Sequence, residues 1–188
     1  SNGRYDLTSK FPTDSRGKFF PSISAGWRVG QEPFMQGLKP AITDFKLRGS
    51  YGSIGNQNVS NYIYIPSYGT TAKVSQLFDG KRPVGVYPPG LVDPNITWET
   101  AATLDFGLDM TLFNKLDVSF DWYNRTTSDI LVDGDKYPAL LGASSPTKNS
   151  GELKTIGWDL TIGYKNRTDY GLNYNLNFVL SDYQTEIT

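Results

Sequence analysis

The feature that most constrains this chain is a strict alternation of apolar and polar side chains, held over unusually long runs. From Trp98 to Leu112 the even-numbered positions are mostly apolar, whereas the odd-numbered positions are polar, small or acidic. Successive side chains of a β-strand point to opposite faces, so this run predicts a strand with one apolar and one polar face. The pattern restarts at Leu116 after the link Phe113–Lys115, and two runs joined so briefly predict a β-hairpin.

The same unit recurs elsewhere in the sequence. Arg4–Leu7 shows the alternation only briefly and would be the end of a further strand. The other long alternating runs are 19–29, 44–52, 155–165 and 170–181. Together with the first hairpin, these runs predict an all-β, antiparallel sheet of about six to seven long strands.

The connections between these runs alternate in length. Two long loops are predicted near 53–97 and 127–151. Shorter links are predicted near 30–42, 113–115 and 166–169. Because antiparallel strands reverse direction at alternate ends, the long loops are expected at one end of the sheet and the short links at the other.

Two architectures fit such a sheet, a soluble β-sandwich and a membrane β-barrel. Alternation alone favours the sandwich, because any half-buried antiparallel sheet shows it. Strands of soluble domains, however, are typically about 5–6 residues long, whereas a membrane-spanning strand needs about 9–11. The polar faces are rich in Gly, Ser, Asn and charge, as in a water-filled lumen, and Trp98, Tyr164 and Tyr170 mark the ends of apolar stripes like an interfacial girdle. The sequence therefore favours a transmembrane β-barrel.

The barrel interpretation also gives the ends of the sheet a direction. Membrane barrels of this kind have short periplasmic turns and longer extracellular loops. We therefore assign the long loops to the extracellular side and the short links to the periplasm. Six strands with such loops are too few to close a barrel, so residues 1–188 are expected to be part of one larger β-barrel domain.

Composition removes several classes of function. The chain contains no His and no Cys, and its 18 basic and 19 acidic side chains nearly cancel. Without His or Cys there is no Ser-His-Asp or Cys-His nucleophile, and no zinc or iron site of the usual kind. A net charge of -1 provides no basic field for non-specific binding of nucleic acid. We therefore expect no enzyme activity, no cofactor, no metal and no nucleic-acid partner.

Several short motifs occur along the chain in a characteristic order. They are Phe19–Arg28 (FFPSISAGWR), Leu47–Gly52 (LRGSYG) with Gly55–Gln57, Pro94–Thr100 (PNITWET), Asp121–Tyr123 (DWY), and Asn149–Leu153 (NSGEL) with Gly157–Leu160 (GWDL). In this order they resemble the barrel of SusC-like (RagA-like) TonB-dependent transporters from the outer membrane of Bacteroidetes. Each motif is weak alone, but the ordered set covers nearly the whole chain.

The resemblance implies a function and several partners. The parent would be a barrel of about 22 strands filled by a plug, covered by a SusD-like surface lipoprotein and driven by TonB. It would import a bulky nutrient, an oligosaccharide or a peptide, with outer-membrane lipid around it. This chain shows neither a plug nor a TonB-interacting segment. The alternatives are a soluble or surface-attached β-sandwich that binds carbohydrate, and a passive porin-like barrel.

Two groups of side chains are candidates for function. Charged residues expected on the lumen face are Arg28, Lys46, Arg48, Asp105, Asp109, Asp117 and Asp121. Carboxylates four residues apart on a strand are about 13 Å apart, beyond the roughly 5–9.5 Å of glycosidase pairs, so a hydrated wall is the better interpretation. In the first long loop, the residues predicted to contact a ligand or the lid protein are Asn56, Gln57, Asn61, Tyr62, Tyr64, Tyr68 and Tyr87. The alternative is that they pack the loop against itself.

Overall fold

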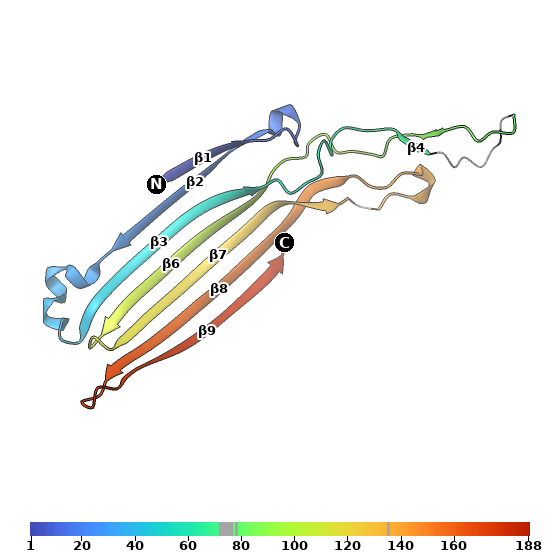
Figure 1. The fold of residues 1–188 in the computed structure, drawn as a ribbon. Coiled ribbons are helices and arrows are strands. Elements are labelled where there is room, and N and C mark those ends of the chain that lie inside the picture. Colours follow the sequence, from blue (N-terminus) through green and yellow to red (C-terminus); the bar gives the residue numbers. More distant parts are fainter. Residues whose placement is uncertain (72–76, 78, 135) are drawn as a thin grey trace.

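A computed structural model describes residues 1–71, 77, 79–134 and 136–188 (Figure 1). Its main element is one curved sheet of seven strands, each antiparallel to its neighbours. The strands are β1 (Asn2–Leu7), β2 (Gly17–Trp27), β3 (Ile42–Asn56), β6 (Glu99–Leu112), β7 (Leu116–Asp133), β8 (Thr147–Arg167) and β9 (Asn173–Ile187). Their order across the sheet follows the chain, and β1 and β9 form its two open edges. The predicted all-β, antiparallel fold is confirmed.

The two ends of the sheet differ, as the lengths of the connections predict. At the first end, called the loop end, lie the links 8–16 with η1 (Thr13–Ser15), 57–98 with the hairpin β4 (Gly69–Thr71) and β5 (Gly85–Tyr87), and 134–146 with η4 (Ala139–Leu141). At the other, called the turn end, lie 28–41 with η2 (Val29–Gln31) and η3 (Pro33–Leu38), 113–115 and 168–172. Figure 1 shows the β4 segment reaching well beyond the sheet. Among the described residues, no helix is long and apolar enough to cross a membrane.

The second long loop is shorter than the sequence predicts. Residues 127–133 and 147–151, which the alternation leaves outside the strands, continue β7 and β8. The reason is a pair of irregularities: the pairing of β7 with β8 shifts between Thr127 and Ile130, where Asp129 has a φ of 58°, and again between Ile130 and Leu131. A bulge adds one residue and exchanges the two faces. The alternating pattern therefore stops at the bulge, although the strand does not.

Most of the fully buried side chains gather at the loop end rather than inside the sheet. Phe11, Phe20, Ile96 and Trp98 form this cluster, with Trp98 only 2% exposed. The Trp98 ring centroid lies 5.4 Å from that of Phe11 and 5.7 Å from that of Phe20. Because β2 pairs with β3 only from Ser22 to Trp27, the cluster lies where these strands separate. It joins the first link, β2 and the end of the long loop.

This cluster corrects one interpretation of the sequence. The sequence predicts a membrane-interface position for Trp98, but its side chain is buried against the loops. It precedes the first residue of β6, and its indole Nε1 donates a hydrogen bond to the Arg16 carbonyl oxygen at 3.3 Å. The alternation places its side chain on a face but does not reveal which neighbours cover it.

Asn149 fixes the end of the long loop from the other side. Its Oδ1 accepts a hydrogen bond from the Thr97 N–H at 2.9 Å, and its Nδ2 donates to the Thr97 carbonyl oxygen at 3.0 Å. The same Nδ2 donates to the Asp129 carbonyl oxygen in the bulge at 2.6 Å. One side chain of β8 therefore binds the chain just before β6 and the bulge of β7. The base of the loop is held on both sides.

Replacing Trp98 by alanine should loosen the loop end while the sheet remains. Truncation of a buried aromatic side chain costs about 3–5 kcal/mol, and here it removes contacts between three chain segments. We expect the full-length protein in membranes to be cut faster within residues 57–98 by added proteinase K. Tyr170→Ala, at a side chain that is 99% exposed, is the control. Equal cleavage of both variants would show that the cluster does not hold the loop.

Candidate functional site

The polar face of the sheet carries most of the charged side chains that the sequence analysis selects. The residue pairing of β3, β6 and β7 puts six of them on one face: Lys46, Arg48, Asp105, Asp109, Asp117 and Asp121. Arg28 lies apart from them, because β2 ends at Trp27 and Arg28 begins the next link. Its guanidinium pairs with Asp44 at 3.7 Å at the turn end.

Arg48 is the centre of a network across three strands. Its Nε donates to Asp109 Oδ2 at 3.0 Å, and its Nη2 donates to Asp121 Oδ2 at 2.8 Å. Its Nη1 lies 2.7 Å from Asp121 Oδ1, an ion pair without hydrogen-bond alignment. Ser119 Oγ donates to Asp109 Oδ1 at 2.8 Å. One guanidinium from β3 thus binds two carboxylates, one from β6 and one from β7.

A glycine makes room for this network. Gly107 is paired with Arg48 on one side and with Asp121 on the other. A Cβ atom at Gly107 would lie 2.5 Å from Arg48 Cζ and 2.6 Å from Asp121 Oδ1, which is too close for either contact. The sequence shows Gly107 only as one small residue on the polar face. Its role depends on neighbours far away in the chain.

Asp117 belongs to a second, separate contact nearer the turn end. Its Oδ2 lies 2.8 Å from Lys165 Nζ, and its Oδ1 accepts a hydrogen bond from Thr111 Oγ1 at 2.8 Å. Asp109, Asp117 and Asp121 therefore bind cations or hydroxyl groups of neighbouring strands. Asp109 and Asp121 share one guanidinium rather than facing each other across an open site. This arrangement supports a charged wall over a pair of carboxylates for hydrolysis.

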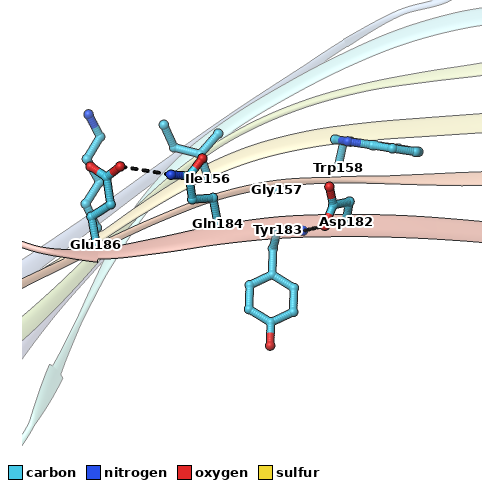
Figure 2. A pocket seen from close by; sticks show the side chains of 8 residues that line it. Ile156, Gly157, Trp158, Asp182, Tyr183, Gln184 and Glu186 are labelled. Atoms are coloured by element: carbon cyan, nitrogen blue, oxygen red, sulfur yellow. Dashed lines mark hydrogen bonds between the residues drawn. The ribbon is translucent and has the colours of Figure 1, made fainter.

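A second group on the polar face lies closer to the loop end, and Asp105 is its one member among the charged candidates selected from the sequence. Asp105, Tyr123, Gly157 and Tyr183 form one row across β6, β7, β8 and β9. Tyr123 lies over Gly157, where a Cβ atom would be 2.5 Å from the Tyr123 hydroxyl oxygen and 2.9 Å from Tyr183 Cβ. Figure 2 shows Tyr183 pointing away from the side that carries Trp158. Tyr123 and Gly157 belong to the DWY and GWDL motifs, but only the register groups them with Asp105 and Tyr183.

The seven residues selected in the first long loop do not form one cluster of printed contacts. Asn56 ends β3 and donates through Nδ2 to Glu99 Oε2 at 3.5 Å, and the Gln57 carbonyl oxygen accepts from Lys10 Nζ at 3.1 Å. Tyr87 lies on β5 opposite Gly69, the residue after Tyr68. The exposed members are Asn56, Gln57, Asn61, Tyr62, Tyr68 and Tyr87, whereas Tyr64 is half-buried. Residues 72–76 and 78 of this predicted loop lie outside the described residues.

The described side chains contain no obvious metal site. Within the described ranges, no three or more Asp or Glu side chains come close enough together to hold a metal ion. The polar face instead carries carboxylates, among them Asp109, Asp117 and Asp121 beside cations, together with hydroxyl-bearing side chains. Such a face can interact with water and with polar solutes.

Comparison with known proteins places this arrangement in a family. Residues 2–188 match the family described as TonB dependent receptor-like, beta-barrel. TonB-dependent receptor P26 of Formosa agariphila is 33% identical over 98% of this chain, and TonB-dependent receptor SusC of Bacteroides thetaiotaomicron is 29% identical over 98% of it. A solved structure of the RagAB peptide importer in its closed-closed state matches 99% of this chain with a TM-score of 0.83 and 25% identity.

The matched proteins are much longer than this chain. It spans 18% of the length of each of these two relatives and 20% of the RagAB chain. The match covers their barrel, and the predicted resemblance to SusC-like receptors is confirmed by it. The two-faced sheet, its long loops and these matches agree. This chain belongs to the TonB-dependent receptor family and is a segment of an outer-membrane β-barrel.

Proposed function

We propose that this chain is part of the wall of an active importer that carries a bulky nutrient, an oligosaccharide or a peptide, across the outer membrane. The parent protein would work with a SusD-like surface lipoprotein and take its energy from TonB. Support comes from the names of similar proteins, since one is SusC and another is a peptide importer. The wall guides solute and performs no catalytic step in this proposal.

The observation that carries the proposal is the division of the sheet into two unlike faces. Leu108, Phe120, Leu160 and Leu180 are neighbours on one face, whereas the Arg48 network lies on the other. A barrel in lipid needs an apolar outside, and a transporter needs a polar inside. We therefore assign the apolar face to the lipid and the polar face to the lumen.

A soluble sandwich would bury the apolar face under a second sheet. The described strands of the main sheet form one layer, and many apolar side chains on it remain exposed, such as Phe106 at 53% and Phe178 at 57%. Lipid is the solvent that tolerates such a surface without a protein cover. The geometry therefore supports a membrane wall over a soluble carbohydrate-binding module.

The lengths of the loops indicate which end of the sheet faces the cell exterior. We assign the loop end to the cell exterior and the turn end to the periplasm, because long loops are extracellular in barrels of this type. The β4–β5 hairpin then extends above the barrel (Figure 1), with Tyr68 71% exposed and Tyr87 56% exposed. These rings are available to stack on a substrate or to contact the lid protein.

The test of energy coupling uses the full-length gene in its own host. We expect deletion of this gene, or of TonB, to abolish growth on one oligosaccharide or peptide nutrient found by screening the deletion strain. We also expect the surface lipoprotein to co-purify with the tagged transporter. Uptake that persists at the same rate without TonB would identify a passive porin instead.

The exposed loop tyrosines should affect uptake and not assembly. Because Tyr68 and Tyr87 project from the anchored loop, Tyr68→Ala with Tyr87→Ala should reduce uptake of that nutrient several-fold at equal levels of folded barrel. Loss of stacked aromatic surface of this kind costs about 0.5–1.5 kcal/mol per ring. Tyr170→Ala at the turn end is the matched control. Unchanged uptake in the double variant would assign the two rings to packing of the loop alone.

The Arg48 network should stabilise the wall. Arg48→Ala leaves Asp109 and Asp121 without their shared cation, and because these side chains are partly exposed we expect a loss of about 1–2 kcal/mol. The full-length barrel should lose its compact form on gels at a lower temperature than the parent. Arg28→Ala, which removes one exposed contact of 3.7 Å, should leave this temperature unchanged. Equal behaviour of the two variants would contradict a structural role for the network.

A further inference from the structure

The apolar face has a sharp upper boundary. In strand order β6 to β9, the pairing gives three apolar rows, Leu112–Leu116–Tyr164–Leu176, Met110–Val118–Ile162–Phe178 and Leu108–Phe120–Leu160–Leu180. The next row toward the loop end is Phe106–Trp122–Trp158–Asp182 and contains the first charge. Beyond it the rows contain Asn124, Gln184, Lys154 and Glu186.

Aromatic rings mark both limits of the apolar rows. Trp122 and Trp158 lie in the upper row, and Tyr164 and Tyr174 lie at the turn end with ring centroids 6.0 Å apart. From Tyr174 to Asp182 the strand rises about 27 Å, which at a tilt of about 40° crosses about 20 Å of membrane. This is close to the roughly 25 Å band of outer-membrane barrels. The row of Trp158 and Asp182 therefore lies at the surface of the membrane.

A hollow lies on the outer side of β8 and β9 directly above this boundary. Its volume is about 280 Å³, and its lining includes Lys154, Ile156, Trp158, Asp182, Gln184 and Glu186. Figure 2 shows the side chains of Ile156, Trp158, Asp182 and Gln184 on the same side of the two strands, whereas Tyr183 points to the other. A further strand would pair with the backbone edge of β9 and leave these directions unchanged.

The lining of the hollow combines apolar side chains with side chains of positive and of negative charge. Ile156 and Trp158 provide the apolar part, at the level where an indole ring meets lipid headgroups. Lys154 has no ion-pair partner among the described residues. Gln184 Nε2 donates to Glu186 Oε1 at 3.0 Å, and the Tyr183 N–H donates to Asp182 Oδ1 at 2.9 Å, so the cation of Lys154 and the second oxygen of each carboxylate remain for a ligand.

We propose that this hollow binds the headgroup of a lipid that carries phosphoethanolamine. The phosphate faces Lys154, the ammonium group faces Asp182 and Glu186, and the acyl chains lie along the apolar rows below Trp158. A headgroup with only negative charge would meet two carboxylates, and one with only positive charge would meet Lys154. The mixed charge of the hollow thus selects a headgroup that has both signs.

The test measures lipid retained by the full-length transporter after purification in detergent. Native mass spectrometry would compare added phosphatidylethanolamine, phosphatidylglycerol and phosphatidylcholine, together with lipid A bearing phosphoethanolamine. We expect phosphatidylethanolamine to be retained over the other two phospholipids, since the choline ammonium group cannot donate hydrogen bonds. Lys154→Ala should lower its retention about fivefold, as for loss of one basic group at a membrane surface. Asp182→Asn should remove the preference over phosphatidylglycerol.

The control variant is Lys165→Ala, a lysine on the polar face at the turn end. It should retain the lipid like the parent, and all variants are compared at equal amounts of folded barrel. If lipid A with phosphoethanolamine is retained with the same dependence on Lys154, the outer leaflet supplies the ligand through that lipid; otherwise the phospholipid supplies it. Equal retention of the three phospholipids, or no effect of Lys154→Ala, would overturn the proposal.

Discussion

Backbone hydrogen bonding is the constraint on which the rest of this structure depends. In a bilayer, every N–H and C=O group of a spanning segment needs a partner inside the protein. The pairing of β3 with β6, β6 with β7, β7 with β8 and β8 with β9, shifted at bulges near the ends of the strands, meets this need over strands of 14 to 21 residues. Once the register is set, the position of each residue in its strand determines the face on which its side chain lies. Every charged side chain inside the membrane must therefore occupy one of the alternate positions that point to the polar face, and the other charges must lie outside the membrane.

The polar side chains follow from the same register. Arg48 reaches Asp109 and Asp121 only because β3, β6 and β7 are aligned with Gly107 between them. Gly107 on the central strand has no side chain, and the guanidinium of Arg48 from the neighbouring strand occupies that space. Charge at the centre of the polar face is thus accommodated beside opposite charge, with Arg48 between Asp109 and Asp121.

Alternation predicts much of this fold because a few consecutive residues are enough to show which side chains of a strand share a face. It identified the long strands, and the structure arranges them in chain order, as is usual for sequential antiparallel strands. It failed at Asp129, where a bulge exchanges the faces, and at Trp98, whose burial depends on Phe11 and Phe20 far away in the chain. The alternating pattern alone was enough to place the charged candidates of β3, β6 and β7 on one face of the sheet. It was not enough to identify their partners, because Arg48 and Asp121 are 73 positions apart.

The hydrogen bonds of Asn149 have a consequence for the assembly of this wall. Thr97 precedes β6, yet the side chain that holds it belongs to β8 and is 52 positions later in the chain. The base of the long loop therefore takes its final form only when β6, β7 and β8 are all in place. The loop surface of this segment depends on the completed sheet beneath it, whichever strand joins first.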